Sequence, residues 1–375
     1  MTETNPREEK GKNIAKKYDQ IKRITERHYE VQSQTTNYAW YTVVATKFGW
    51  SCTCADHTYR HVCCKHIHAV EFSIKLRKKV LEENTVIIQP VIINSCLFCK
   101  SGNIKKFGIR KNKHYNIQRF VCSDCHKTFS ENMGFEKLKH NPKGITTAMQ
   151  LYFSGESLRN VAKSLKLLGM DVTHQTVYNW IEKYTGLMEK YLDKITPQVS
   201  DTWRADEIFL KVKGNTKYLY AMMDDETRFW IAKQIADKKY MENVRPMFKE
   251  AMETAQKKPE VLITDGARNF GVACRKEYGS WQLPRTVHIR HVHLKGDMNN
   301  NKMERLNGEI RDREKIIRGL KKENTPIIRG YQIFHNYIRP HMGLDGRTPA
   351  EACGIKIEGG NKWLALIQNG SKRVD

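Results

Sequence analysis

The chain has 375 residues, of which 39% are hydrophobic, and its 65 lysines and arginines outweigh 41 aspartates and glutamates to give a formal net charge of +24 at pH 7. At roughly 150 residues per domain, this length excludes a single small core and predicts two or three units. The excess charge favours a polyanionic partner, because lysines and arginines displace condensed counterions from phosphates; the alternative is a generally basic protein such as a ribosomal one.

The apolar segments and the cysteines indicate in which cellular compartment we expect the protein. No stretch reaches the roughly 18 apolar residues that a membrane-spanning helix needs. The N-terminal sequence MTETNPREEKGKN lacks the apolar segment of a secretory signal. We therefore expect a cytoplasmic protein without membrane contact, in which ten cysteines favour metal binding over disulfides. Eight of the ten lie between Cys52 and Cys125, which indicates local metal sites.

The first part of the chain is strongly charged. Residues 10–28 carry apolar side chains at helical spacing, and we interpret them as an amphipathic arm or helix. Residues 38–50, YAWYTVVATKFGW, are rich in aromatic and β-branched side chains and predict one or two strands.

The first cysteine cluster reads CTCADHTYRHVCCKH. One residue separates Cys52 from Cys54, and one separates Cys64 from His66; three cysteines and a histidine are a common structural zinc set. The pattern resembles the SWIM zinc finger, whose Cys-x-Cys and Cys-x-His pairs bind zinc. Structural histidines or redox thiols are the alternative reading. Rival ligands are Cys63, which stands where proline is common in that family, and His57, His61 and His68.

The second cluster consists of two Cys-x-x-Cys knuckles, CLFC and CSDC. Cys96, Cys99, Cys122 and Cys125 have the spacing of a zinc ribbon, and a thioredoxin-like motif would need only one such pair. The segment between the knuckles, KKFGIRKNKHYNIQRFVC, interleaves basic and aromatic residues and predicts a DNA-facing hairpin that includes Lys111 and Lys113. A merely solvated basic surface is the alternative.

A helical segment follows near residues 142–190. Apolar residues at helical spacing begin after a capping Ser157, Gly169 interrupts them, and Thr173 can cap a second helix. The buried stripe of this second helix would be Val177, Trp180, Ile181 and Tyr184. Its outward positions are His174, Gln175, Tyr178 and Asn179, which in a recognition helix face base edges in the major groove. A generic helical hairpin is the alternative to this helix-turn-helix.

Three acidic residues occur in distinctive places beyond residue 200. Asp206 falls on the apolar face of a predicted strand, WRADEIFLKVKG, where a carboxylate is costly unless a cation compensates it. Asp265 ends the short apolar strand in PEVLITDGARNF, and Gly266 allows the chain to turn. Glu304 lies near the start of the predicted helix NNNKMERLNGEIRDREKIIRGL.

The order of these acids resembles that of the DDE transposases and retroviral-type integrases, which have an RNase H-like fold. DEIFLKVKG and KYLYAMMD are similar to the first hairpin of the insertion-sequence-six group, and Asn300 and Asn301 ahead of Glu304 fit that group. ERLNGEIRDREK, which includes Arg311, and NYIRPHMGLDGRTPAEACGI are similar to integrase-type cores. The resemblance covers about residues 142–356 and implies a transposase that cuts and rejoins DNA.

The resemblance also implies the site and its cofactors. Asp206 would bridge two Mg²⁺ or Mn²⁺ ions about 3.5–4 Å apart, with Asp265 on one ion and Glu304 on the other. Water would expose a 3′-hydroxyl at the element end, and that hydroxyl would attack target DNA. Arg311 and Lys315, further along the same helix, could contact phosphates or form a solvated face. Rival carboxylates are Asp224, Asp225, Glu207 and Glu309.

The expected fold class is α/β: an RNase H-like catalytic domain, with a mixed sheet flanked by helices, preceded by small zinc-binding modules and an all-α helix-turn-helix. The expected organisation, in residue numbers, is a charged arm 1–36, a SWIM-type zinc finger 37–80, a zinc ribbon 90–135, a helix-turn-helix 142–190, a catalytic domain 200–356 and a tail 357–375.

The expected partners are double-stranded DNA, as element ends and target, and further copies of the chain in a homodimer or larger assembly on DNA. We expect two structural zinc ions and a nucleoid-associated protein of a prokaryotic-type cell. One alternative is a domesticated, non-catalytic DNA-binding regulator, which would have no use for the three acids. Another is a hydrolytic nuclease of the same fold, which would have no use for the ribbon and the helix-turn-helix.

Overall fold

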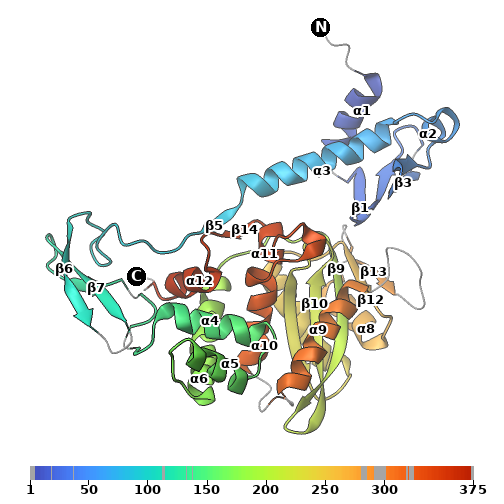
Figure 1. Ribbon diagram of the computed structural model, residues 1–375. Helices are drawn as coiled ribbons and strands as arrows, with labels where there is room; N and C mark the ends of the chain where they lie inside the picture. The colour runs from blue at the N-terminus through green and yellow to red at the C-terminus, as the bar shows by residue number, and fades with distance from the viewer. Residues whose placement is uncertain are drawn as a thin grey trace. The chain divides into compact units, whose positions relative to one another are not determined.

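The computed structural model describes residues 5–17, 19–36, 38–111, 115–131, 133–136, 138–279, 285–290, 301–317, 320 and 325–372. The chain divides into two compact units. Unit 1 comprises residues 1–85, 197–210 and 216–309, and unit 2 comprises residues 86–196, 211–215 and 310–375. Figure 1 labels many of the helices and strands of both units along the chain.

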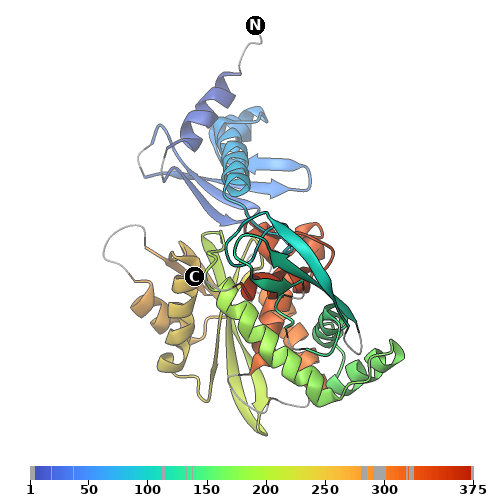
Figure 2. The same cartoon turned by 90° about the vertical axis from the view of Figure 1, so that its left-hand side faces the viewer.

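Unit 1 begins with a module of helices around a four-stranded antiparallel sheet of order β1-β2-β3-β4. Its elements are α1 (Pro6–Ala15), β1 (Ile21–Thr25), β2 (His28–Gln32), β3 (Trp40–Thr46), β4 (Gly49–Cys52), α2 (Ala55–Arg60) and α3 (Lys65–Glu83). Tyr29, Val31, Val43 and Val70 are buried in its core. Figure 2 shows α3 lying across the strands of this sheet.

The prediction of a separate arm or helix at residues 10–28 is wrong beyond Ala15. Helix α1 ends there, and β1 and β2 form a hairpin whose second strand pairs with β3 from Gln32↔Trp40 to His28↔Val44. The reason is that Tyr29 and Val31 alternate into the core on β2, so the sheet gains both backbone pairing and burial from this segment. The expected boundary between residues 36 and 37 therefore runs through one sheet.

The second part of unit 1 contains a five-stranded mixed sheet of order β11-β10-β9-β12-β13. Its strands are β9 (Thr202–Val212), β10 (Asn215–Asp224), β11 (Trp230–Ala236), β12 (Val261–Thr264) and β13 (Val287–Arg290). β12 is parallel to both β9 and β13, and β10 is antiparallel to β11. The helices that accompany the sheet are α7 (Met241–Ala255), α8 (Arg268–Glu277) and α9 (Asn301–Ile317), of which residues 310–317 belong to unit 2. A mixed sheet with helices confirms the predicted fold class.

The burial of the strands follows their position in the sheet. On β9, Ile208 and Leu210 are buried while Phe209 between them is 47% exposed, which is the alternation of a half-covered strand. All four residues of β12 are buried, as expected for an interior parallel strand that is covered on both faces. Asp265 therefore stands directly after the carboxyl end of this buried strand.

Unit 2 combines two small sheets, of order β14-β5 and β6-β7-β8, with a helical bundle. Its strands are β5 (Val86–Ile88), β6 (Ile104–Lys111), β7 (Asn116–Cys122), β8 (Thr128–Ser130) and β14 (Ile355–Ile357). Its helices are α4 (Pro142–Phe153), α5 (Leu158–Leu167), α6 (His174–Leu192), α10 (Pro326–Ile333), the π-helical η1 (Phe334–Ile338), the 3₁₀ turn η2 (Met342–Leu344), α11 (Pro349–Ala352) and α12 (Lys362–Gly370). Among the residues described, no helix is both long enough and apolar enough to span a bilayer.

The segment expected to be a tail, residues 357–375, contains the helix α12. Asn361 caps α12, and this helix buries Trp363 and Leu366. The Trp363 ring stacks on Phe153 with centroids 5.5 Å apart, and its Nε1 donates to Gln150 Oε1 at 2.8 Å. The apolar residues of this segment complete the bundle around α4, so it belongs to the core of unit 2.

Candidate active site and metal centres

Asp206 lies on β9 beneath α9. Asn307 Nδ2 donates to Asp206 Oδ2 at 2.8 Å, and the Glu207 backbone N–H donates to Oδ1 at 2.8 Å. Burial and, to a smaller extent, the negative charge of Asp265 raise the pKa of Asp206 to about 6, against the hydrogen bonds from the Glu207 N–H and Asn307, which lower it. A carboxyl group in this environment favours a nearby cation, which would compensate the charge that burial penalises.

Asp265 directly follows the carboxyl end of β12. The register of the parallel strands pairs Ile263 with Arg204, and Asp265 and Asp206 each lie two residues further along the chain. Gly266 has φ of +92°, which turns the chain away, and the Ala267 N–H donates to Asp265 Oδ1 at 3.0 Å. The sheet therefore brings the two aspartates together.

Glu304 lies in the first turn of α9 and is exposed. Asn307, one turn further along, bonds to Asp206, and residues three apart on a helix share a face. Within the described residues, however, no hydrogen bond joins Glu304 to either aspartate, and the three carboxylates do not form a cluster with all ligand atoms within 4.8 Å. The structure thus places Glu304 on the helix that docks at Asp206, without direct contact between the acids.

A buried charge network beside the triad was not predicted from the sequence. Arg204, two residues before Asp206 on β9, forms an ion pair with Asp225, and their side chains are 1% and 0% exposed. Lys302, two residues before Glu304 on α9, contacts Asp225 Oδ1 at 3.1 Å and donates to its backbone oxygen at 2.6 Å. Asp225 therefore links the strand of the first acid to the helix of the third.

The pKa of Asp225 reflects this pairing. Burial alone would raise it, but the charges of Lys302 and Arg204 and their hydrogen bonds lower the pKa below its ordinary value. The carboxylate is thus kept ionised inside the protein by two cations, which is a structural role rather than that of a metal ligand.

The other rival carboxylates also have partners. Asp224 accepts hydrogen bonds from Ser200 Oγ at 2.5 Å and from the Thr227 N–H at 2.8 Å. Glu207 forms an ion pair with Lys239. Glu309 also makes an interaction of its own. The structure therefore favours none of the rivals over the three predicted acids.

The four predicted SWIM ligands converge in the N-terminal module. Cys52 ends β4, Cys54 precedes α2, Cys64 precedes α3, and His66 lies in the first turn of α3. All four are buried, and their ligand atoms lie within 4.8 Å of one another. Hydrogen bonds from Cys52 and His66 lower the pKa of Cys64 to about 3, so one thiol of the set gives up its proton readily. This donor set fits a closed tetrahedral zinc site.

The rival SWIM ligands lie elsewhere. His57 Nδ1 is 2.8 Å from the Val62 carbonyl oxygen, which identifies a hydrogen bond to the backbone. His61 is exposed in a left-handed conformation with φ of +52°. Cys63 and His68 belong to a second cluster together with Glu71.

The ribbon cysteines converge in the same way. Cys96 Sγ lies 3.5 Å from Cys125 Sγ, and Cys99 Sγ lies 3.5 Å from Cys122 Sγ. Each knuckle closes with a left-handed residue directly after its second cysteine: Lys100 has φ of +62° and His126 has φ of +56°. The two knuckles are thus built alike, and their four sulfurs fit one tetrahedral zinc ion.

The basic hairpin between the knuckles is exposed. Seven of the eight residues of β6 are exposed, including Lys111 at its end, while Lys113 lies outside the described residues. On α9, Arg311 is exposed and Lys315 pairs with Asp312 at 3.0 Å. Lys111, Arg311 and Lys315 are therefore all exposed to solvent.

The helix-turn-helix forms with the predicted caps. Ser157 accepts from the Asn160 N–H before α5, and Thr173 accepts from the Thr176 N–H before α6. Val177, Trp180, Ile181 and Tyr184 are buried, as predicted. His174, Gln175 and Asn179 are exposed and Tyr178 is half-buried. Gln175 Nε2 donates to Asn179 Oδ1 at 2.9 Å, so the two amides form one unit on the outer face.

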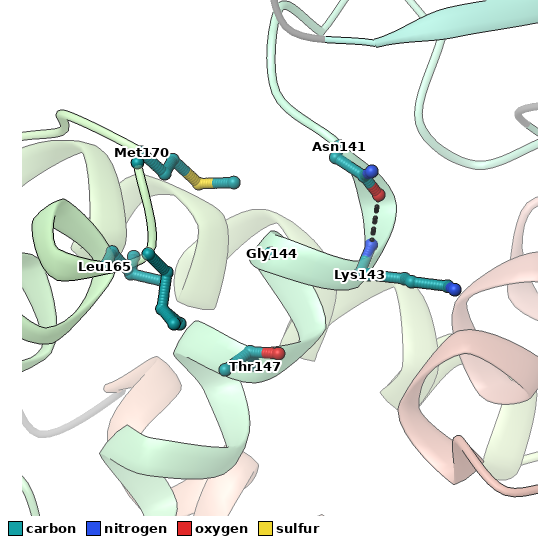
Figure 3. A pocket seen from close by; sticks show the side chains of 8 residues that line it. Asn141, Lys143, Gly144, Thr147, Leu165 and Met170 are labelled. Atoms are coloured by element: carbon teal, nitrogen blue, oxygen red, sulfur yellow. Dashed lines mark hydrogen bonds between the residues drawn. The ribbon is translucent and has the colours of Figure 1, made fainter.

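A hollow of about 320 Å³ adjoins this motif, between the start of α4 and the turn after α5. Figure 3 shows Met170 reaching toward Gly144, and a Cβ at Gly144 would lie 1.9 Å from Met170 Cε. Leu165 and Thr147 line the same hollow. Because the triad residues do not line it, we assign it no part in the chemistry.

Arg313 anchors the far end of α9, a role that was not predicted from the sequence. Its guanidinium lies 4.0 Å from the Tyr152 ring centroid, and Nη1 donates to the Glu156 carbonyl oxygen at 3.1 Å. The residue is only 5% exposed, whereas its neighbours Arg311 and Asp312 are exposed. A buried arginine within a basic stretch gives no sequence signal that separates it from solvated ones.

Comparison with known proteins gives matches over parts of the chain. A family model described as a DDE domain, of the IS240 transposase type, matches residues 200–341. The chain is 28% identical over 164 residues to the transposase for the insertion sequence-like element IS431mec of Staphylococcus aureus, covering 43% of this chain and 71% of that protein. The transposase for IS257 in transposon Tn4003 of the same organism gives the same values.

A shorter match and two solved structures complete the comparison. The chain is 31% identical over 84 residues to the insertion element iso-IS1N protein InsA of Shigella dysenteriae, covering 22% of this chain and 87% of that protein. The simian T-cell lymphotropic virus intasome aligns at 13% identity and a TM-score of 0.33, over 43% of this chain and 56% of that one. The HTLV-2 integrase catalytic core domain in complex with magnesium aligns at 18% identity and a TM-score of 0.29, over 42% and 98%.

Proposed function

We propose that the chain is a DDE-type transposase of an insertion sequence and that Asp206, Asp265 and Glu304 are the acids with which it cuts and rejoins DNA. The single observation that carries this assignment is the parallel register of β12 and β9, in which Asp265 and Asp206 stand at equivalent positions. Glu304 then enters from the helix that Asn307 holds against Asp206.

The residues fit divalent cations. Three carboxylates supply the oxygen ligands that Mg²⁺ or Mn²⁺ prefers, and the half-buried Asp206 favours a compensating charge. Two such ions would activate the attacking oxygen and relieve charge on the leaving oxygen of a phosphodiester. We assign Asp206 to both ions, Asp265 to one and Glu304 to the other.

The protein groups around the acids hold this arrangement. Asn307 fixes the Asp206 carboxylate through Oδ2, and Asp225 with Lys302 fixes the start of α9. Such positioning matters because phosphoryl transfer requires the attacking and leaving oxygens in line. Cleavage by water would free a 3′-hydroxyl, and strand transfer would use that hydroxyl on the target.

The remaining modules would bind the DNA. We assign His174, Gln175, Tyr178 and Asn179 to base edges, and Lys111, Lys113 and Arg311 to phosphates. The SWIM set and the ribbon set would each hold one structural zinc ion. The substrate would be double-stranded DNA at the element ends and the target, bound by a homodimer or larger assembly at the nucleoid.

A direct test incubates the purified chain with Mg²⁺ and end-labelled double-stranded DNA from the ends of its own element. We expect nicking at the element end followed by joined products on a second, unlabelled duplex. Joined products separate a transposase from a hydrolytic nuclease, which would release fragments only. Specific binding without any cleavage in Mg²⁺ or Mn²⁺ would instead identify the non-catalytic regulator.

A further inference from the structure

A third cluster of metal-binding side chains lies beside the start of α3, separate from the two four-residue zinc sets. Cys63 precedes the helix, and His68 and Glu71 stand three residues apart on it, with all ligand atoms within 4.8 Å of one another. We propose that Cys63, His68 and Glu71 bind a third divalent transition-metal ion of the zinc type. One coordination position would remain for water or an exogenous donor.

The spacing of the donors supports this site. Cys63 Sγ lies 3.9 Å from His68 Nδ1, and His68 Nδ1 lies 3.4 Å from Glu71 Oε2. In the SWIM set, His66 Nδ1 lies 3.9 Å from a cysteine sulfur as well. Ligands at about 2.0–2.3 Å from a tetrahedral ion are roughly 3.3–3.8 Å apart, so both clusters have nearly the spacing that zinc requires.

The site is held by packing on one side and open on the other. Gly11 of α1 contacts α3 so closely at this point that a Cβ would lie 2.6 Å from His68 Cβ. The His68 side chain is 16% exposed and that of Glu71 is 40% exposed, while Cys63 is exposed. The histidine is thus fixed, and an ion can enter from solvent.

The cluster also gives Cys63 a role that the SWIM set does not. Cys64, not Cys63, is grouped with Cys52, Cys54 and His66. Three protein ligands with mixed sulfur, nitrogen and oxygen atoms form an open zinc site, whereas four form a closed one. Binding would release the Cys63 thiol proton to solvent, and the third ion would be the first to leave under mild chelation.

The test is metal content per chain of the full-length protein after equilibration with zinc and removal of free ions. We expect Cys63→Ser and Glu71→Gln each to lose one ion relative to the wild type. Graded chelation of the wild type should release that ion before the others. His61→Asn is the matched control, because His61 is exposed outside the cluster and asparagine tolerates its left-handed backbone; it should lose none.

Two outcomes would overturn the proposal. One is an unchanged ion count in both Cys63→Ser and Glu71→Gln. The other is loss of an ion in Cys63→Ser but not in Glu71→Gln, which would mean that Cys63 serves the SWIM site instead. Replacing zinc by cobalt adds a readout that does not depend on the total count, because the ion lost in Cys63→Ser should carry a single thiolate-to-cobalt charge-transfer band. Comparison with the wild type keeps the result independent of how fully the two other zinc sets are occupied.

Discussion

Asn307 on α9 donates a hydrogen bond to Asp206 on β9, so the helix that carries Glu304 is fixed at the first acid by a residue one turn further along. The bond orients the carboxylate and docks the helix at the same time. Partners of this kind, which hold a metal ligand in place without binding the metal, typically affect metal affinity by 10–100-fold when removed.

Asn307→Ala should therefore weaken Mg²⁺-dependent cleavage by roughly 10–100-fold and raise the Mg²⁺ concentration needed for half-maximal rate. Asn307→Asp should be worse, because it places a second negative charge beside Asp206. The measurement is cleavage rate against Mg²⁺ concentration. The exposed Asp312→Ala on the same helix is the control, and an Asn307→Ala enzyme with an unchanged Mg²⁺ requirement would contradict the positioning role.

Removing the buried Asp225 charge should destabilise unit 1. Asp225→Asn removes the buried carboxylate that Arg204 and Lys302 share, and breaking a buried pair typically costs about 3–5 kcal/mol. The folded-state pKa of Asp225 lies below its ordinary value, so its contribution to stability is present at neutral pH and is lost as the pH falls through that lowered pKa. Denaturant unfolding should therefore show a deficit at pH 7 that narrows in acid. A constant deficit across pH would refute the ion-pair account.

Each zinc set should lose its ion and its local fold without affecting the other set. Cys64→Ser should unfold the N-terminal module and release the metal ions held at the start of α3, both that of the SWIM set and that of the Cys63 cluster, whereas Cys122→Ser should release one ion and disorder the ribbon. Limited proteolysis with zinc analysis distinguishes the two variants. Loss of the ribbon ion in Cys64→Ser, or of an ion of the N-terminal module in Cys122→Ser, would mean that the sites are not independent.

The recognition helix and the ribbon should read DNA differently. Gln175→Ala or Asn179→Ala should cost about 1–3 kcal/mol at one base position and relax specificity there. Lys111→Ala or Lys113→Ala should weaken binding to every sequence and flatten its salt dependence. Competition binding on substituted element ends at two salt concentrations measures both. If the helix variants lost affinity equally for every sequence and the ribbon variants changed base preference, the ribbon would recognise the bases and the helix would bind phosphates.

Local sequence patterns predicted much of the site, because each of the predicted features depends on residues that are close together in the chain. The zinc sets, the caps at Ser157 and Thr173, and the buried stripe of α6 follow from spacing alone. Asn307 could also have been found, since it stands on the face of Glu304 one turn away. The Asp225 pairs join residues far apart in the sequence, and charged residues in isolation look like a solvated surface.

The two segments whose secondary structure differs from the prediction have a common explanation. Charged residues around Tyr29 hid the alternation of β2, and a polar surrounding hid the apolar face of α12 around Trp363. In both cases long-range packing decided the structure, because each segment pairs with or packs on elements that the local pattern does not reveal.

The central claim is tested most directly by separating DNA binding from catalysis in the three acids. Asp206→Asn, Asp265→Asn and Glu304→Gln keep the side-chain shape and remove the charge that would hold the divalent ions. Each variant should bind element-end DNA with an affinity close to that of the wild type, yet lose both cleavage and strand transfer in Mg²⁺. If any one of the three retained near-wild-type strand transfer, that residue would not belong to the catalytic triad.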